Sequence, residues 1–150
     1  MKMITQALNI IDFIRHPSIL NDQTMSLSQT AFLKSAYGLA LNEVEMEIYR
    51  RGTGREIYFP CEQRETTLLG GRRGGKTGKL GARIALYEAC RDHRIPRGER
   101  AYVMLIAPVV AQAKIAFNYI LNDFYSSPIL SLKIAKVGRN ENDHTGFEYH

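Results

Sequence analysis

Residues 70–77 read Gly70-Gly71-Arg72-Arg73-Gly74-Gly75-Lys76-Thr77 and fit the pattern G-x-x-x-x-G-K-[ST] at every fixed position. Glycine lets a phosphate chain approach the backbone closely, because successive N–H groups can turn inward without a Cβ clash. A helix that follows directly presents the positive end of its dipole to the anion. This stretch, called the phosphate loop below, therefore predicts binding of a nucleoside triphosphate.

The polar residues of the phosphate loop have distinct expected roles. Lys76 would reach the β- and γ-phosphates of ATP as a point charge, and the Thr77 hydroxyl would be a ligand of Mg²⁺. Arg72 and Arg73 occupy variable positions: either both point to solvent, or one contacts the γ-phosphate and stabilises charge that develops on transfer. The motif alone does not distinguish a hydrolase from a kinase or a non-hydrolysing binder. Its non-functional interpretation is a plain glycine-rich turn. The expected cofactor-binding residues in the loop are Gly70, Gly71, Arg72, Arg73, Gly74, Gly75, Lys76 and Thr77.

Helix signals dominate the chain before residue 53. They are an apolar repeat at i, i+4 and i+7, a Ser-x-x-Gln capping box, and an Asn that can serve as an N-cap. A proline after the first signal and a glycine after the second mark helix ends. The three predicted helices run from about Ile4 to His16, from Ser26 to about Tyr37 and from Asn42 to about Gly52.

From residue 53 onward, short β-prone runs alternate with helical repeats. Tyr102–Ala107 is a continuous apolar run, which is typical of a strand buried on both faces of a parallel sheet. Apolar spacing predicts helices over Thr77–Cys90 and Val109–Phe124. The predicted strands are Glu56–Phe59, Thr66–Leu69, Tyr102–Ala107 and, as a candidate, Ile129–Val137.

The order strand, phosphate loop, helix, strand, helix predicts the α/β class. We expect a P-loop NTPase-type parallel sheet with flanking helices, incomplete, and preceded by an N-terminal helical segment. The corresponding division of the chain is a helical segment over residues 1–52 and a partial P-loop ATPase core over residues 53–150.

Charge and cysteine content narrow the function classes. The net charge is +5, and the segment from Arg50 to Arg100 holds 13 Lys and Arg against 6 Asp and Glu, which favours an anionic partner. Within that segment, Lys79 and Arg83 on the helix after the phosphate loop are interpreted as surface charges. Two isolated cysteines suit a reducing compartment. With no run of about 18 apolar residues and no secretory signal, we expect a cytoplasmic protein without membrane contact.

Three segments give the sequence a family resemblance. They are Gly71–Thr77, the following Gly81–Ala89 (GARIALYEA), and Leu105–Ala113 (LIAPVVAQA). Together they resemble the large terminase subunit of tailed bacteriophages, over roughly residues 15–135. The phosphate loop is specific to a superfamily, whereas the arginine pair within it and the APxxxQA segment favour terminases in particular.

The terminase resemblance implies a motor that hydrolyses ATP with Mg²⁺ to drive double-stranded DNA into a capsid, in the cytoplasm of a bacterial host. It implies the portal protein and the small terminase subunit as partners, and it allows a homo-oligomeric ring. The family's arginine finger on the γ-phosphate matches Arg72, beside the catalytic Lys76. The family's adenine-contacting glutamine matches Gln29 best, although Gln29 also fits the reciprocal position of the capping box.

The sequence also departs from the terminase pattern. No run of four apolar residues is followed by Asp-Glu, so the Walker B acid pair is missing. The nearest string, Tyr119–Asp123, falls on a predicted helix and lacks the glutamate. The coupling motif and the nuclease domain are missing too. We therefore expect the N-terminal part of a large terminase subunit, binding nucleotide weakly and hydrolysing it poorly.

Two other functions stay open at this point. One is a different P-loop enzyme, such as a small-molecule kinase, for which the arginine-rich loop Arg91–Arg100 could serve as a lid. The other is a basic nucleic-acid-binding module without ATPase activity, whose glycine loop grips backbone phosphates.

Overall fold

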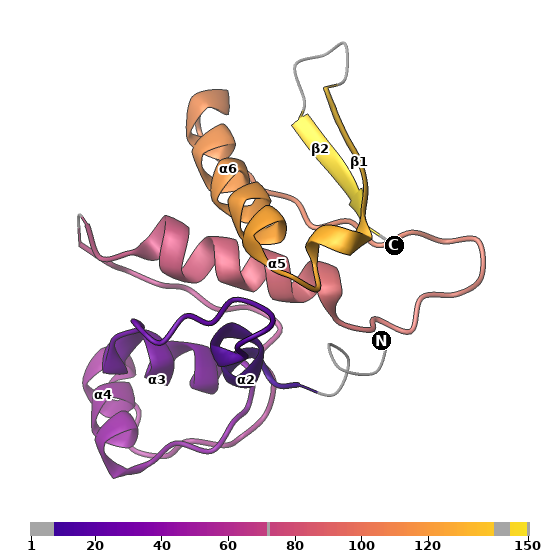
Figure 1. The fold of residues 1–150 in the computed structure, drawn as a ribbon. Helices are drawn as coiled ribbons and strands as arrows, with labels where there is room; N and C mark the ends of the chain where they lie inside the picture. The colour runs from indigo at the N-terminus through magenta and orange to yellow at the C-terminus, as the bar shows by residue number, and fades with distance from the viewer. Residues whose placement is uncertain (1–7, 72, 140–144, 150) are drawn as a thin grey trace.

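The computed structural model describes residues 8–71, 73–139 and 145–149 (Figure 1). From residue 133 onward it describes the backbone alone. Helices dominate it. A helix that follows the phosphate loop crosses the centre, with α2, α3 and α4 on one side and α6 with a two-stranded sheet on the other. The sequence between α4 and the central helix runs as an extended connection.

The three N-terminal helices are held by their caps. They are α2 (Ile10–Arg15), α3 (Leu27–Ala36) and α4 (Glu43–Thr53). Both α3 and α4 begin with a complete capping box, formed by Ser26 with Gln29 and by Asn42 with Glu45. The second and third predicted helices are therefore confirmed. The first is confirmed only from Ile10 onward, because Asn9 is its N-cap, and residues 4–7 lie outside the described residues.

The central helix begins inside the phosphate loop. Its first part, η1 (Lys76–Gly81), is a π-helical turn, and it continues as α5 (Ala82–Cys90). Further along the chain, α6 (Val110–Ser126) matches the helix predicted over Val109–Phe124. A short 3-10 turn, η2 (Ser131–Lys133), then leads into the sheet.

One apolar core joins the N-terminal helices to the central helix and α6. Phe13 and Ile14 of α2, Leu86 of α5 and Phe124 of α6 are completely buried in it. The Phe13 ring meets the Tyr87 ring edge to face, with centroids 5.4 Å apart. Residues from both sides of the predicted domain boundary near residue 52 contribute to this core. The boundary itself stays a prediction.

The predicted parallel sheet is wrong. The described residues contain a single sheet, in which β1 (Ile134–Arg139) pairs antiparallel with β2 (Thr145–Tyr149) and Val137 lies opposite Phe147. The candidate strand Ile129–Val137 thus overlaps β1 only in its second half. Neither a P-loop NTPase-type α/β fold nor its flanking arrangement of helices is present in the described part of the chain.

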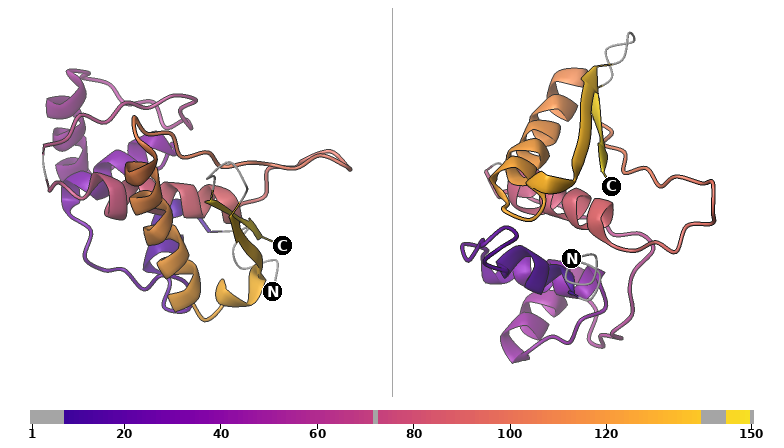
Figure 2. Two further views of the ribbon diagram at one scale, coloured as in Figure 1. Left: turned by 90° about the horizontal axis from the view of Figure 1, so that it is seen from above. Right: turned by 45° about the vertical axis from the view of Figure 1, so that its right-hand side comes forward.

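The three other predicted strands are extended but unpaired. No backbone hydrogen bond joins residues 66–69 or 102–107 to another described part of the chain. The run expected at the centre of a sheet is exposed instead, Tyr102 by 80% and Ile106 by 89%. It belongs to the long connection between α5 and α6, which both views of Figure 2 show projecting away from the helices. Apolar content alone does not make a strand, because a strand also needs a neighbour for its N–H and C=O groups.

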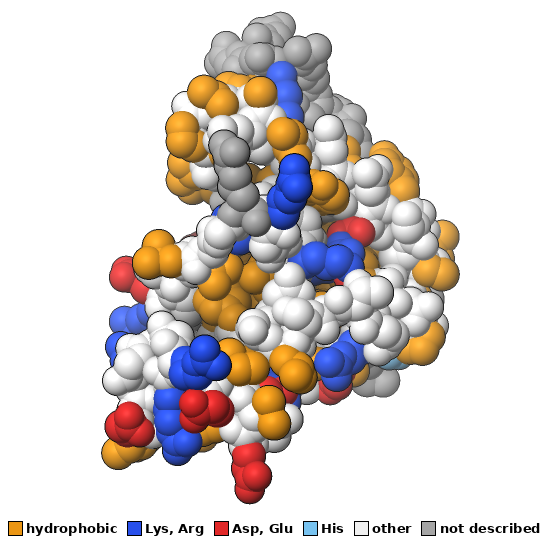
Figure 3. Space-filling model, turned by 90° about the vertical axis from the view of Figure 1, so that its left-hand side faces the viewer, with side chains coloured by type: hydrophobic (Ala, Val, Ile, Leu, Met, Phe, Trp, Pro, Cys, Tyr) orange, Lys and Arg blue, Asp and Glu red, His pale blue; other side chains and the backbone are white. Residues whose placement is uncertain are grey.

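No helix in the described residues is both long and apolar enough to cross a bilayer. Apolar side chains do lie at the surface of several elements, as on the face drawn in Figure 3. On that face the Lys and Arg side chains are scattered among acidic and apolar ones. The basic residues counted in the sequence therefore do not form one continuous patch there.

The core assignment can be tested with two phenylalanines of opposite exposure. Phe13→Ala should lower the free energy of unfolding by about 3–5 kcal/mol, because Phe13 is fully buried. Phe59→Ala, at a side chain 72% exposed, should change it by less than about 0.5 kcal/mol. Urea unfolding followed by circular dichroism measures both. Equal losses would show that Phe13 does not belong to the core.

Candidate functional site

The phosphate loop connects the extended segment after α4 to the start of η1. Two of its residues have left-handed backbone conformations, Arg73 with φ 62° and Gly75 with φ 73°. Glycine adopts this conformation freely, whereas arginine is strained in it. Such strain is typical of ligand-binding loops, where the surrounding structure holds the backbone in a fixed path.

Lys76 lies back over the loop that precedes it. Its ammonium donates hydrogen bonds to the carbonyl oxygens of Gly70 and Gly71, at 2.7 and 2.6 Å. A methyl group on Gly70 would collide with the Lys76 stem, since it would come within 2.8 Å of Cδ. The lysine ammonium therefore lies against the loop carbonyls while its side chain stays exposed, and Thr77 is exposed directly after it.

The π-helical turn η1 sets the geometry of the helix start. The Ala82 amide donates to the Thr77 carbonyl, five residues back. The Lys79 amide donates to the Gly75 carbonyl at 2.8 Å, which closes the first turn on the phosphate loop. Single π turns are rare in proteins as a whole, but those that occur within α-helices often lie at functional sites.

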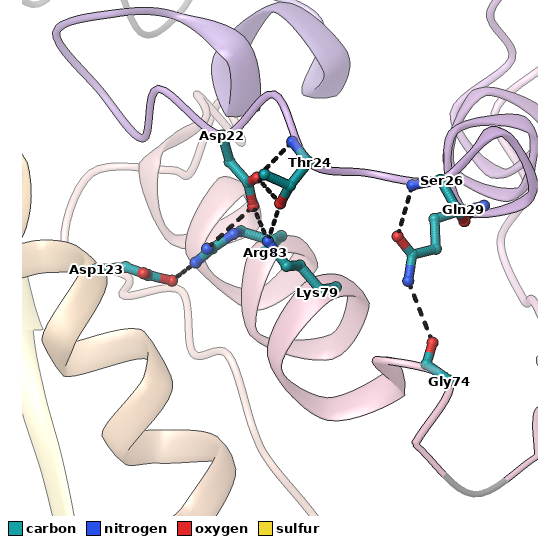
Figure 4. A network of polar contacts seen from close by, with 8 residues as sticks. All are labelled: Asp22, Thr24, Ser26, Gln29, Gly74, Lys79, Arg83 and Asp123. Atoms are coloured by element: carbon teal, nitrogen blue, oxygen red, sulfur yellow. Dashed lines mark hydrogen bonds and ion pairs between the residues drawn. The ribbon is translucent and has the colours of Figure 1, made fainter.

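Gln29 contacts the phosphate loop from α3. Its side-chain oxygen accepts from the Ser26 amide in the capping box, at 3.0 Å, while its side-chain NH₂ donates to the Gly74 carbonyl, at 3.2 Å (Figure 4). The capping role expected for Gln29 is confirmed. The structure thus places the candidate adenine-binding glutamine beside the loop, with its amide already engaged at both ends.

A buried carboxylate ties the central helix to the loop after α2. One oxygen of Asp22 accepts from the amide and the hydroxyl of Thr24, and the other accepts from Lys79 at 2.8 Å and from Arg83 at 3.4 Å (Figure 4). Lys79 also donates to the Thr24 hydroxyl. Both carboxylate oxygens are saturated, so Asp22 is fully compensated despite an exposure of only 8%.

Arg83 extends this network to α6, where it pairs with Asp123 (Figure 4). The Arg83 side chain is only 13% exposed, so its interpretation as a surface charge is wrong. Asp123 is the acid of the string nearest to a Walker B motif. It lies on α6, as expected, and its contact with Arg83 gives it a structural role that joins two helices.

The environment of Asp22 shifts its titration. Burial raises the pKa of Asp22, but hydrogen bonds from Lys79 and Thr24 more than offset this effect, and the pKa lies well below its ordinary value of 3.8. The carboxylate is therefore ionised over the whole physiological range, and the ion pairs with Lys79 and Arg83 persist there.

The other predicted site residues belong to the phosphate loop. Arg72 lies outside the described residues. Arg73 is exposed, and so are Gly71, Gly74 and Thr77. No group of three or more His, Cys, Asp or Glu side chains suited to a metal ion occurs in the described part of the chain. Thr77 accordingly offers Mg²⁺ a single hydroxyl, which fits an ion held mainly by phosphate oxygens and water.

Two residues of the site were missed by sequence reasoning, Asp22 and Thr24, and the ion-pairing role of Asp123 was not foreseen. Asp22 and Lys79 lie 57 positions apart, and no local pattern links them. A weak signal exists in the pair Lys79 and Arg83, since residues four apart share a helix face. Two basic residues on one face of a helix that also carries a buried apolar face indicate an acidic partner.

Comparison of the chain with family models, with curated proteins and with solved structures finds no match. The terminase resemblance therefore stays a hypothesis that rests on the motifs themselves.

Two glycines of the loop test its backbone path. Gly75→Ala should lower the free energy of unfolding by about 1–3 kcal/mol, because φ is positive there and the new methyl group would lie 2.8 Å from the Gln29 amide nitrogen. Gly71→Ala should cost less than about 0.5 kcal/mol, since nothing lies within 4 Å of its Cβ position. Thermal or urea unfolding compares them, and a larger loss at Gly71 would contradict the described loop.

The buried carboxylate predicts a specific pH dependence. Because the folded-state pKa of Asp22 is depressed, its stabilisation is complete above the unfolded-state value near 3.8 and is lost as the pH falls through the lower folded-state value. Asp22→Asn should cost about 3 kcal/mol at pH 7, the lower end for a broken buried ion pair.

Urea unfolding between pH 7 and pH 2 measures this effect. The difference between wild type and Asp22→Asn should shrink below pH 4. A residual acid dependence should persist in the variant, because the pKa of Glu45 is lowered as well. A difference that stays constant with pH would show that the charge of Asp22 is not what stabilises the fold.

Proposed function

We propose that the chain binds the triphosphate of ATP, with Mg²⁺, through the phosphate loop. The observation that carries this proposal is the position of Lys76. Its ammonium donates hydrogen bonds to the carbonyl oxygens of Gly70 and Gly71 at the start of a 15-residue helical run, Lys76–Cys90. A cation held at the positive end of a helix, within a glycine loop, is suited to an incoming polyphosphate.

Phosphate binding would replace contacts that the loop now makes with itself. The two glycine carbonyls compensate the Lys76 charge in this conformation, and phosphate oxygens would take over that role. The loop amides and the first amides of η1 would then face the anion. Thr77, exposed beside Lys76, would add its hydroxyl to Mg²⁺, whose remaining ligands would be phosphate oxygens and water.

The roles proposed for the neighbouring residues follow the terminase resemblance. Arg72 would act on the γ-phosphate, and Arg73 would line the loop. Gln29 would contact the adenine base after giving up its hydrogen bond to Gly74, while its oxygen could keep the capping box of α3. The contact between Gln29 and the loop supports this role by placing the amide close to the phosphate site.

We infer binding rather than efficient hydrolysis. The sequence has no Asp-Glu pair after an apolar run, and the nearest acid, Asp123, is engaged with Arg83. Asp22, which is joined to the loop through Lys79, is engaged as well, so neither of these two carboxylates is free to activate water. A chain that binds ATP without its own catalytic base depends on further residues for turnover.

The wider role proposed for the chain is that of the N-terminal part of a phage terminase large subunit. ATP binding would then serve the packaging of double-stranded DNA into capsids, in a bacterial host cytoplasm, together with the portal protein and the small subunit. The support is the arginine pair of the loop and the APxxxQA segment. A large terminase subunit also provides the acid pair and the nuclease domain that are missing here.

The proposal predicts that Lys76→Ala abolishes nucleotide binding, because the loop loses the charge that meets the β- and γ-phosphates. Isothermal titration with Mg-ATP should show a loss of at least about 100-fold in affinity, the cost of removing a charged contact of about 3 kcal/mol. Arg51→Ala, which removes an exposed positive charge at the end of α4, should bind like wild type. Equal affinity of wild type and Lys76→Ala would refute the assignment.

A further inference from the structure

Lys79 connects the phosphate loop to the N-terminal part of the fold. Its backbone amide is bonded to the Gly75 carbonyl, and its Cβ and Cγ lie 3.2 Å from the position that a Gly75 Cβ would occupy. The other end of the same side chain is bonded to Asp22 and Thr24. The lysine therefore spans from the residue directly before Lys76 to a buried carboxylate 57 positions earlier.

We propose that Asp22, acting through Lys79, is a positioning residue of the phosphate loop. By anchoring the Lys79 ammonium, it holds the stem of that side chain against Gly75. Gly75 in turn sets the direction in which Lys76 and Thr77 leave the loop. This inference rests on the proposed function, since it assigns a further residue to the same phosphate site.

Electrostatics alone gives Asp22 no reason to lie close to a triphosphate site. A carboxylate near bound phosphate repels it and so lowers affinity. The cost is offset if the carboxylate fixes the geometry of the site, because a small displacement of binding groups can lose more affinity than one distant charge. The saturated contacts of Asp22 fit an anchor: both oxygens are used, and its backbone amide donates to the Ile14 carbonyl at 3.0 Å.

The chain contains a second ion pair of the same kind, whose side-chain hydrogen bonds involve no described residue of the phosphate loop. Lys34 of α3 donates to Glu45 of α4 at 2.8 Å, the same distance as between Lys79 and Asp22. The two carboxylates are equally buried, with side-chain exposures of 4% and 7%. This pair offers a matched control, since its loss should affect stability without displacing the phosphate loop.

The experiment compares Asp22→Asn, Lys79→Met, Lys34→Met and Lys76→Ala with wild type. Isothermal titration at 10 °C uses two probes, Mg-ATP and magnesium tripolyphosphate, after circular dichroism has shown that each variant is folded. Tripolyphosphate has no base, so it reports on the loop without any contribution from adenine contacts. Asp22→Glu, which keeps the charge, tests for rescue.

Asp22→Asn is the decisive variant because the two explanations predict opposite signs. Loss of positioning weakens both probes about fivefold or more, whereas loss of a nearby negative charge strengthens them. We expect weaker binding for Asp22→Asn and Lys79→Met, partial recovery in Asp22→Glu, and a change of less than twofold for Lys34→Met.

Binding by Asp22→Asn that equals or exceeds that of wild type would overturn the positioning role while leaving the proposed function intact, provided that Lys76→Ala has lost binding. A comparable loss in Lys34→Met would also overturn it, because the effect would then follow from stability. If wild type and Lys76→Ala bind the probes alike, the proposed function itself is wrong.

Discussion

The rest of the structure depends on the burial of one helix, the run Lys76–Cys90. Its apolar side chains, with Leu80 and Leu86 almost or fully inaccessible, fill the space between the N-terminal helices and α6. Apolar burial is the main favourable contribution to folding, so this helix cannot shift without disrupting the whole core. Because the phosphate loop leads directly into it, the position of Lys76 follows from core packing. Apolar packing has no preferred direction. The hydrogen bonds and ion pairs of Asp22 with Lys79 and Arg83 therefore fix the orientation of the central helix against the loop after α2.

The sequence predicted those parts of the fold whose signals are local. Ser26 with Gln29, and Asn42 with Glu45, satisfy the free amides of their own helix starts, so each helix could be located from a few neighbouring residues. The sheet was predicted wrongly because strand pairing depends on distant parts of the chain. Tyr102–Ala107 has the composition of a central strand, yet its extended backbone has no partner among the described residues.

The residues of the candidate site also fall into two groups, those with a local sequence signal and those without one. Lys76 and Thr77 were found from a motif of eight residues, because the glycine loop and the helix start are adjacent in sequence. The anchoring of that loop could not be found, since Asp22 and Asp123 approach the central helix only after the chain has folded. Arg83 shows why the surface interpretation failed: it has the composition of a solvated helix face, but its partners arrive from two other elements and remove it from water.

The exposed connections on either side of the central helix have a practical consequence for handling the protein. Basic residues such as Arg64 and Arg97 lie there in exposed, non-helical backbone, which is the form of substrate that proteases such as trypsin accept. After cleavage at both places the three fragments would stay associated. The shared core and the ion pairs of Asp22 and Arg83 join segments on either side of each cleavage site. A preparation nicked in this way would migrate as one species by gel filtration and as several under denaturing conditions.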